Sequence, residues 1–205
     1  MNALEIRGLT KRRGDFALQG LDLTLPAGCI MGLIGENGAG KSTTIRLILN
    51  ALSRDGGTVA VYGKDNRALT PLEREDIGAV LDEATSGLDP VVRDEILTIF
   101  ADFTRDEEHA VLLSSHIVSD LEKICDYIAF LHKGRLLLCE EKDRLTEAYG
   151  ILRGGAEDID PAAVCGRHTT PYGTEYLVRR DAVPAGMALG QVNIEDLFVF
   201  MAKEV

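Results

Sequence analysis

The clearest pattern along the chain is an apolar run of five residues followed by an amphipathic stretch. Residues 30–34 (Ile-Met-Gly-Leu-Ile) predict a buried strand. From Ser42 onward, apolar residues recur at the spacing of one helix face, at Ile45, Ile48, Leu49 and Leu52. Further strands are predicted over residues 3–8, 16–25 and 58–62.

The alternation of strands and helices continues downstream. An apolar strand is predicted over residues 77–81, and Asp89-Pro90 predicts the cap and first turn of a helix. We expect that helix to turn four residues inward: Ile96, Ile99, Phe100 and Phe103. A strand over residues 109–115 follows. Strands alternating with helices predict an α/β fold with a mainly parallel central sheet, buried on both faces.

The next stretch predicts a helix, a hairpin and a short closing helix. The helix face is marked by Ile117, Leu121, Ile124 and Ile128. Residues 127–131 and 135–139 are expected to pair across a Lys133-Gly134 turn, and a helix is expected over residues 142–149.

The character of the sequence changes near Gly150. Residues 154–158 (Gly-Gly-Ala-Glu-Asp) are polar and predict a flexible segment. A strand over residues 176–178 follows, and then an amphipathic helix marked by Ile194, Leu197, Phe198 and Met201. We therefore divide the chain into a core over residues 1–148 and a small accessory region over residues 149–205.

Composition narrows the possible partners and location. The 205 residues are 45% hydrophobic and 27% charged, which is typical of a globular protein with a full core. The net charge of −11 argues against nucleic acid as a partner. The sequence contains no apolar run long enough to span a bilayer and no signal-peptide pattern, and its four cysteines form no Cys-x-x-Cys pair. We expect a cytoplasmic protein whose cysteines are small core residues in a reducing compartment.

A glycine-rich loop joins the predicted strand to the predicted helix. It reads Gly35-Glu36-Asn37-Gly38-Ala39-Gly40-Lys41-Ser42-Thr43 and fits the phosphate-binding pattern, in the strand–loop–helix context that this pattern requires. The glycines let successive N–H groups point at one anion, and the helix N-terminus adds positive potential. Lys41 is expected to reach the β- and γ-phosphates and Ser42 to ligate Mg²⁺. The alternative is a glycine turn that binds nothing.

Two carboxylates, Asp82 and Glu83, follow the apolar strand over residues 77–81. In phosphate-loop ATPases one carboxylate at such a strand end holds Mg²⁺, and a neighbouring polar group orients the attacking water. Taken alone, the pair is equally compatible with a solvated strand end.

The sequence around these motifs resembles that of ABC-type ATPases. Residues 82–90 (Asp-Glu-Ala-Thr-Ser-Gly-Leu-Asp-Pro) resemble the second nucleotide motif and D-loop, and residues 111–116 (Val-Leu-Leu-Ser-Ser-His) the switch-histidine strand. Residues 126–135 and 18–23 resemble further strands of that family, and all occur in family order. The chain is similar to the ATP-binding subunit of an ABC transporter, and the resemblance extends to the exporter type whose permease is a separate chain.

The resemblance implies a phosphate-loop NTPase core with N-terminal antiparallel strands, and roles for individual residues. Ser42 and Asp82 would ligate Mg²⁺, Glu83 would be the general base, and His116 would contact the γ-phosphate of ATP. Asp89 would belong to the D-loop. The partners would be ATP, a second ATP-binding subunit and a permease at the inner face of the membrane. His109, His132 and His168 have no such support, and we interpret them as surface or packing residues.

The family pattern is interrupted between the phosphate loop and the Mg²⁺ carboxylate. The family places a glutamine loop and a helical subdomain with a Leu-Ser-Gly-Gly signature there, whereas the segment between Lys41 and Asp82 contains no glutamine and no signature. Residues 75–81 resemble the strand that leads into the glutamine loop, and residues from Asp82 onward resemble the later motif. We hypothesise an internally shortened chain, joined where two similar Val-Leu-Asp-Glu stretches once stood. We interpret Leu152-Arg153-Gly154-Gly155, an echo of the signature, as a linker.

These departures leave three functional hypotheses. The first is an ATPase subunit that drives transport. The second is a nucleotide-binding remnant or modulator with little or no turnover, which the missing signature favours because a lost donor removes transition-state stabilisation. The third, a small-molecule kinase, is disfavoured by the ABC-like motifs. Arg13 occupies the place where the family stacks adenine on an aromatic; Phe16 is an alternative, and is as well explained as a core residue.

Overall fold

The computed structural model describes residues 1–71, 73, 89–115, 117–154, 159–171 and 173–203. Within it the chain divides into two compact units, Met1–Cys139 and Glu140–Val205, which are described separately. Of the predicted elements, the strand over residues 77–81 lies outside the described residues.

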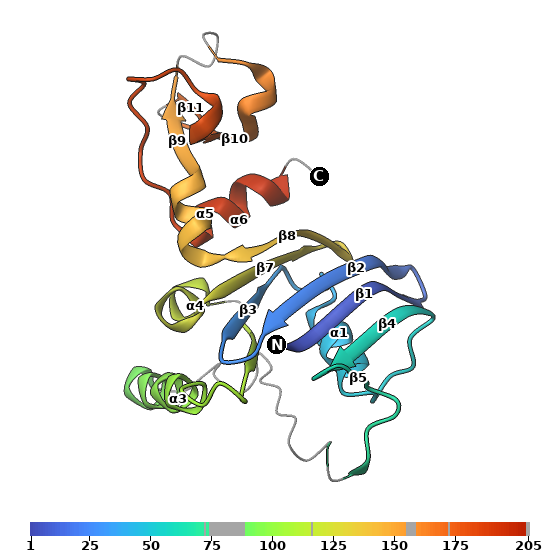
Figure 1. Cartoon of the computed structure of the whole chain (residues 1–205). Coiled ribbons are helices and arrows are strands. Elements are labelled where there is room, and N and C mark those ends of the chain that lie inside the picture. The colour runs from blue at the N-terminus through green and yellow to red at the C-terminus, as the bar shows by residue number, and fades with distance from the viewer. Residues whose placement is uncertain (72, 74–88, 116, 155–158, 172, 204–205) are drawn as a thin grey trace. The chain divides into compact units, whose positions relative to one another are not determined.

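The first unit contains an antiparallel sheet of four strands in the order β2-β1-β4-β5 (Figure 1). Its strands are β1 (Asn2–Arg13), β2 (Phe16–Pro26), β4 (Gly56–Val61) and β5 (Lys64–Asp65). β2 agrees with its prediction to within one residue, whereas β1 is longer than predicted, because its pairing with β2 continues to Arg13 beside the turn. Alternate residues of β2 point into the core, as the buried Leu21, Leu23 and Leu25 show.

The second sheet of this unit carries the phosphate loop. Its order is β6-β3-β7-β8, formed by β6 (Val111–Ser114), β3 (Ile30–Ile34), β7 (Tyr127–His132) and β8 (Arg135–Glu141). β3 is parallel to both β6 and β7, which confirms the α/β fold with a mainly parallel sheet. Every residue of β3 is buried, as expected for a strand with neighbours on both sides and layers on both faces.

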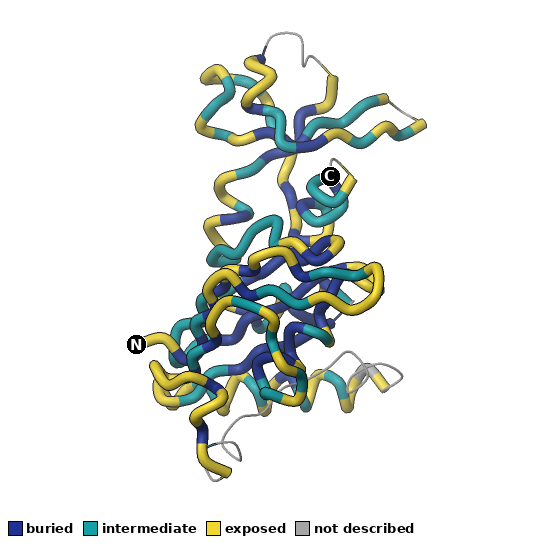
Figure 2. The backbone as a smooth tube through the Cα atoms, turned by 90° about the vertical axis from the view of Figure 1, so that its right-hand side faces the viewer, coloured by how far each residue is buried: buried dark blue, intermediate teal, exposed yellow. Residues whose placement is uncertain are grey.

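This unit includes the helices α1 (Lys41–Ile48), α3 (Pro90–Phe103) and α4 (Val118–Ile124). α4 packs on β3 where Gly32 has no side chain; a Cβ on Gly32 would lie 3.1 Å from Cys125 Sγ and 3.2 Å from Leu121 Cδ1. Buried residues of α1 and of both sheets form one apolar cluster, which Figure 2 shows as dark blue segments along the strands.

Three helix predictions are corrected by the structure. α1 ends at Ile48, so Leu52 is not on it; Asn50 takes a left-handed φ of 54°, and the buried Asn66 amide donates to the carbonyls of Leu47 and Ile48. α4 ends at Ile124, and Ile128 lies in β7 instead, because Asp126 accepts a bond from the Ile30 N–H and starts the strand.

The third correction concerns α3. Its start is as predicted, with Pro90 in the first turn and the Asp89 carboxylate accepting from the Val91 N–H. Leu97 is buried, however, whereas Ile99 and Phe103 are 62% and 46% exposed, so these two do not point inward.

Within its described residues, the second unit has a three-stranded antiparallel sheet with two helices. The sheet order is β10-β11-β9, formed by β10 (Val164–Thr170), β11 (Gly173–Arg179) and β9 (Tyr149–Arg153), and the helices are α5 (Lys142–Ala148) and α6 (Ile194–Lys203). α6 packs on β10, where the Phe200 ring meets that of His168 edge-on, with centroids 5.9 Å apart. Two short 3₁₀ turns, η3 (Pro161–Ala163) and η4 (Arg180–Ala182), complete it.

One sequence interpretation in this part is wrong. Leu152 and Arg153 are not a linker but the end of β9, and Leu152 is buried because it packs with Ile159 and Val178. Of the four cysteines, Cys125 is buried, and Cys29 and Cys139 are partly buried and pack against the apolar cluster of the first unit, in agreement with their interpretation as core residues; Cys165 is partly buried. Residues 155–158, expected to be flexible, lie outside the described residues, and the predicted helix at the C-terminus is α6.

Candidate nucleotide site

The phosphate loop connects β3 to α1, and residues of β2 and β7 pack closely against its backbone. Leu131 O of β7 lies against Gly35, where a Cβ would come within 2.4 Å of it. At the other end of the loop, a Cβ on Gly40 would lie 2.7 Å from Phe16 Cζ and 2.9 Å from Leu18 Cδ2. Glycine at these two positions therefore lets β2 and β7 approach the loop backbone.

The helix that follows the loop begins at an N-terminus with no side-chain cap. Gly40 is the N-cap with φ 114°, and as a glycine it has no side chain to accept from the first turn. The first N–H groups of an α-helix have no partner within the helix, so this end of α1 offers donors and partial positive charge to an anion.

Lys41 is the cation of the site. The residue is 5% exposed, and its Nζ donates to Gly35 O at 2.6 Å and lies 3.4 Å from Glu36 O. The loop therefore wraps around the ammonium group, which places one positive charge at the base of the loop beside the N-terminus of α1. Ser42, the next residue, is exposed, and its hydroxyl is available to a metal ion.

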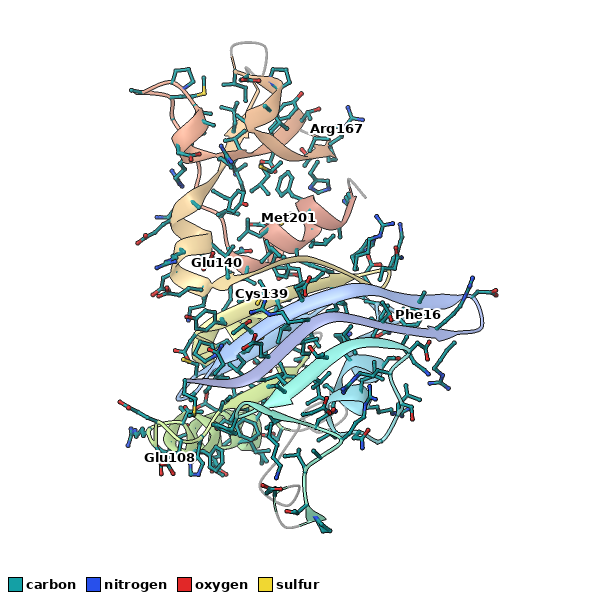
Figure 3. The ribbon with its side chains drawn as sticks, turned by 45° about the vertical axis from the view of Figure 1, so that its right-hand side comes forward. Phe16, Glu108, Cys139, Glu140, Arg167 and Met201 are labelled. Carbon is teal, nitrogen blue, oxygen red and sulfur yellow. The ribbon has the colours of Figure 1, made fainter. Side chains whose placement is uncertain are left out.

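A cavity of about 650 Å³ lies over the loop. One side is formed by the β1–β2 turn, and the other by the loop and the start of α1; the lining comprises Arg13, Gly14, Phe16, Glu36, Asn37, Gly38, Gly40, Lys41, Ser42 and Thr43. Phe16 is the first residue of β2 and lies next to this turn at the end of the hairpin (Figure 3). Residues that the sequence assigned to the phosphates and to the adenine end thus line one cavity, of a volume typical of ligand sites.

The two-residue turn between β7 and β8 is hydrogen-bonded to the phosphate loop. Lys133 (φ 45°) and Gly134 (φ 77°) both take left-handed conformations, as a tight hairpin turn of this kind requires. The Gly134 N–H donates to Ala39 O in the loop at 2.9 Å, and Gly134 O accepts from the Gln19 N–H of β2 at 2.9 Å. The predicted hairpin across Lys133-Gly134 is confirmed, and it joins β2 to the phosphate loop.

His132, immediately before this turn, was interpreted from sequence as a surface or packing residue. It is 3% exposed, and its Nδ1 lies 3.7 Å from Glu36 Oε2. Neither ring nitrogen has a hydrogen-bond partner in the part of the chain that the structure describes. The sequence signal was a histidine at the end of an apolar strand, one position before a turn that meets the loop.

Asp82, Glu83 and His116 lie outside the described residues, and their predicted roles stay predictions. Asp89, assigned to the D-loop, is the N-cap of α3. No helix among the described residues is both long and apolar enough to cross a membrane.

The sequence of this site matches that of a known protein family. The family model described as ABC transporter matches residues 18–147, which is more than half of the chain. The chain belongs to the ABC transporter family. The match begins in β2 and includes the phosphate loop, β6, β7 and β8, so it covers the phosphate-binding side of the site, whereas Arg13, Gly14 and Phe16 precede it.

Curated relatives are ATP-binding proteins of this ABC transporter family. The chain is 43% identical over 96 residues to the daunorubicin/doxorubicin resistance ATP-binding protein DrrA of Streptomyces peucetius, an alignment covering 44% of this chain and 29% of DrrA. It is 24% identical to the ABC transporter ATP-binding protein YtrB of Bacillus subtilis and to the lantibiotic transport ATP-binding protein SrtF of Streptococcus pyogenes. These alignments cover 71% and 68% of this chain, and 74% of YtrB and 91% of SrtF.

The lengths of those two alignments bear on the internal shortening. They run over 217 and 210 residues, more than the 205 residues of the whole chain, yet each includes only about seven-tenths of it. The relatives therefore carry a segment with no counterpart here. This supports the expectation of an internally shortened ABC transporter ATP-binding domain.

Solved structures show the same fold. An ATP-binding subunit of an ABC transporter matches with a TM-score of 0.59 and 19% identity, covering 70% of this chain and 91% of that one. CbiO1 of Clostridium perfringens, part of the ABC transporter complex CbiONQ, matches with a TM-score of 0.61 and 16% identity, covering 71% and 91%. The phosphate-loop NTPase fold of the ABC ATP-binding domain is thus confirmed.

Proposed function

We propose that the chain binds ATP with Mg²⁺ in the cavity over the phosphate loop and turns it over slowly or not at all. The observation that carries the proposal is the cavity itself, which joins the uncapped N-terminus of α1 and the buried Lys41 to the exposed face formed by Arg13 and Phe16. The helix N-terminus and the lysine are suited to a polyphosphate, and the arginine and phenylalanine side chains are suited to stack on a nucleobase.

Each group has a distinct task in this proposal. The α1 N–H groups and the Lys41 ammonium bind the phosphate oxygens, while the Arg13 guanidinium or the Phe16 ring stacks on the base. The Ser42 hydroxyl and the Asp82 carboxylate would hold Mg²⁺, which bridges phosphate oxygens and offsets their charge. Glu83 would accept a proton from the attacking water, and His116 would contact the terminal phosphate.

Turnover is proposed to be slow because the sequence lacks the family's signature motif and glutamine loop. Removing one preorganised donor to developing charge costs about 10²–10³ in rate, and here a whole donor set is missing. The alternative is an active ATPase subunit that works with a permease and a second ATP-binding subunit at the inner face of the membrane. The relatives named for transport support that alternative.

Affinity and hydrolysis measured together separate the two. Mg·ATP binding by isothermal titration and steady-state phosphate release should be compared for the native chain, Lys41→Ala and Glu83→Gln. We expect native binding, loss of binding by at least about 100-fold in Lys41→Ala, and no more than trace hydrolysis in any of the three. Brisk native hydrolysis abolished in Glu83→Gln would favour the active subunit, and absence of native binding would refute both.

A further inference from the structure

The imidazole of His132 is an anomaly of the first unit. The ring is enclosed at the end of β7 and has no hydrogen-bond partner among the described residues, at either nitrogen. A buried polar group left unpaired costs about 1–3 kcal/mol, so an apolar side chain would serve better if packing were the only role. We therefore ask which polar group near the ring could bond to it.

The nearest candidate is the Glu36 carboxylate. Its Oε2 lies 3.7 Å from His132 Nδ1, which is too long for a hydrogen bond and less than 1 Å from a good one. Other charged groups of the surrounding elements are Lys41 on the loop and Lys133 in the turn; Lys41 Nζ is directed to Gly35 O. Among the described residues, Glu36 is the carboxylate within 4 Å of the ring.

Glu36 also has a reason to need a partner. Its side chain is 62% exposed and borders the cavity over the phosphate loop, where its negative charge opposes that of a polyphosphate. His132 is not among the residues that line the cavity. A bond to His132 would hold the carboxylate beside the loop and toward β7, and away from the phosphates.

The backbone around His132 is suited to hold the ring in place. Leu131 O, directly before it, lies against Gly35, and the Gly134 N–H, two residues after it, donates to Ala39 O. The backbone on either side of His132 thus contacts both ends of the loop segment that contains Glu36, which places the ring next to this segment.

We propose that His132 is a positioning residue for nucleotide binding: its Nδ1–H donates to the Glu36 carboxylate and keeps that charge off the phosphate-binding face of the loop. The proposal rests on the proposed function, since it concerns the affinity of the same cavity for Mg·ATP. It makes His132 act through Glu36 and not through packing.

The test is a double-mutant cycle with a rescue variant, read as Mg·ATP affinity. His132→Leu should weaken binding about fivefold to tenfold, because a charge-assisted bond to a partly exposed carboxylate is lost. His132→Asn keeps an N–H donor near the Nδ1 position and should stay within about twofold of the native chain. In a Glu36→Gln background, His132→Leu should change affinity by less than about twofold. His109→Leu, a partly exposed histidine outside this cavity, is the matched control and should bind like the native chain.

Two results would overturn the proposal. One is an equal loss in His132→Leu with and without Glu36; the other is a loss in His132→Asn as large as that in His132→Leu. Because His132→Leu alone could destabilise the loop, ¹⁵N spectra of the imidazoles provide an independent readout. Glu36→Gln should move the His132 ring resonances and leave those of His109 in place, and unmoved His132 resonances would also overturn the pairing. If the native chain binds no nucleotide, the proposed function fails, and the ¹⁵N comparison still decides whether the pair exists.

Discussion

The surroundings of the phosphate loop and those of α3 differ in how completely they are packed. Around the loop, strands from both sheets approach the backbone so closely that glycines are required, and α1 turns Ile45, Leu47 and Ile48 into the shared core. On α3, Leu97 is buried, while Val92, Ile99 and Phe103 leave an apolar stripe exposed among the described residues. Phe103 also borders a second, largely apolar cavity of about 920 Å³.

Apolar residues on two faces are typical of a helix that is covered on two sides in a larger core. α3 begins at Pro90, just beyond the part of the sequence where the family's helical subdomain is missing. The difference therefore indicates that the fold keeps its full packing where the family pattern is continuous, and leaves a helix partly uncovered next to the interruption.

The largest effect is expected from a substitution that adds a side chain where the β7–β8 turn packs against β2. Gly134→Ala places a Cβ 1.9 Å from Ala17 O at a φ of 77°, so we expect the free energy of unfolding to fall by about 3–4 kcal/mol. Gly63→Ala is the matched control, because Gly63 has a similar φ of 79° and no neighbouring atom within 4 Å; it should cost about 1 kcal/mol. Urea denaturation of both variants measures the difference, and equal losses would mean that the close approach to β2 contributes nothing.

The two faces of α3 should respond very differently to substitution. Leu97→Ala removes a buried side chain and should lower the free energy of unfolding by about 3 kcal/mol. Ile99→Ser, on the exposed stripe, should change it by less than about 0.5 kcal/mol. Denaturant titrations would show both effects; a large loss in Ile99→Ser would mean that the stripe is covered in solution.

The smallest expected effect is electrostatic and concerns Asp55, which bonds to two residues of β1. The pKa of Asp55 is lowered because its carboxylate accepts hydrogen bonds from Lys11 Nζ and from the Arg12 N–H. A folded pKa below the unfolded value of about 3.9 means that the contribution to stability is present above that pH and is lost as the pH falls through the folded value.

This contribution should be visible in acid. The melting temperature of the native chain should decline more steeply below about pH 4 than that of Asp55→Asn, and the two profiles should run parallel above about pH 5. Parallel profiles throughout would show that the Asp55 bonds do not persist in solution.

Sequence reasoning succeeded where structure depends on local order. The strand over residues 30–34, the loop after it and the Lys133-Gly134 hairpin all follow from patterns a few residues long. It failed where two local solutions compete: α3 has apolar residues on two faces, and periodicity alone cannot say which face is buried. Ile128 fitted a helical spacing but lies in a strand. That strand follows the bond from the Ile30 N–H to Asp126, and these two residues are 96 positions apart in the sequence.

The site was predictable only in part, for a related reason. The loop residues carry a contiguous motif, so they could be assigned directly. The contact between His132 and Glu36 joins positions that no spacing rule connects, and it depends on β7 running parallel to β3 and ending beneath the loop. Such a contact becomes visible only in three dimensions.

Asn66 caps the C-terminal end of α1 and also links this helix to the antiparallel sheet. Its amide ties the last carbonyls of α1 to the corner after β5, while the first turn of the same helix faces the phosphate-binding cavity. The helix is short and internally hydrogen-bonded, so a displacement of its first turn would also move its last turn. Any push that a nucleotide's phosphates exert on one end of α1 would be delivered to the edge of the antiparallel sheet, so that this corner becomes the place where occupancy could be sensed.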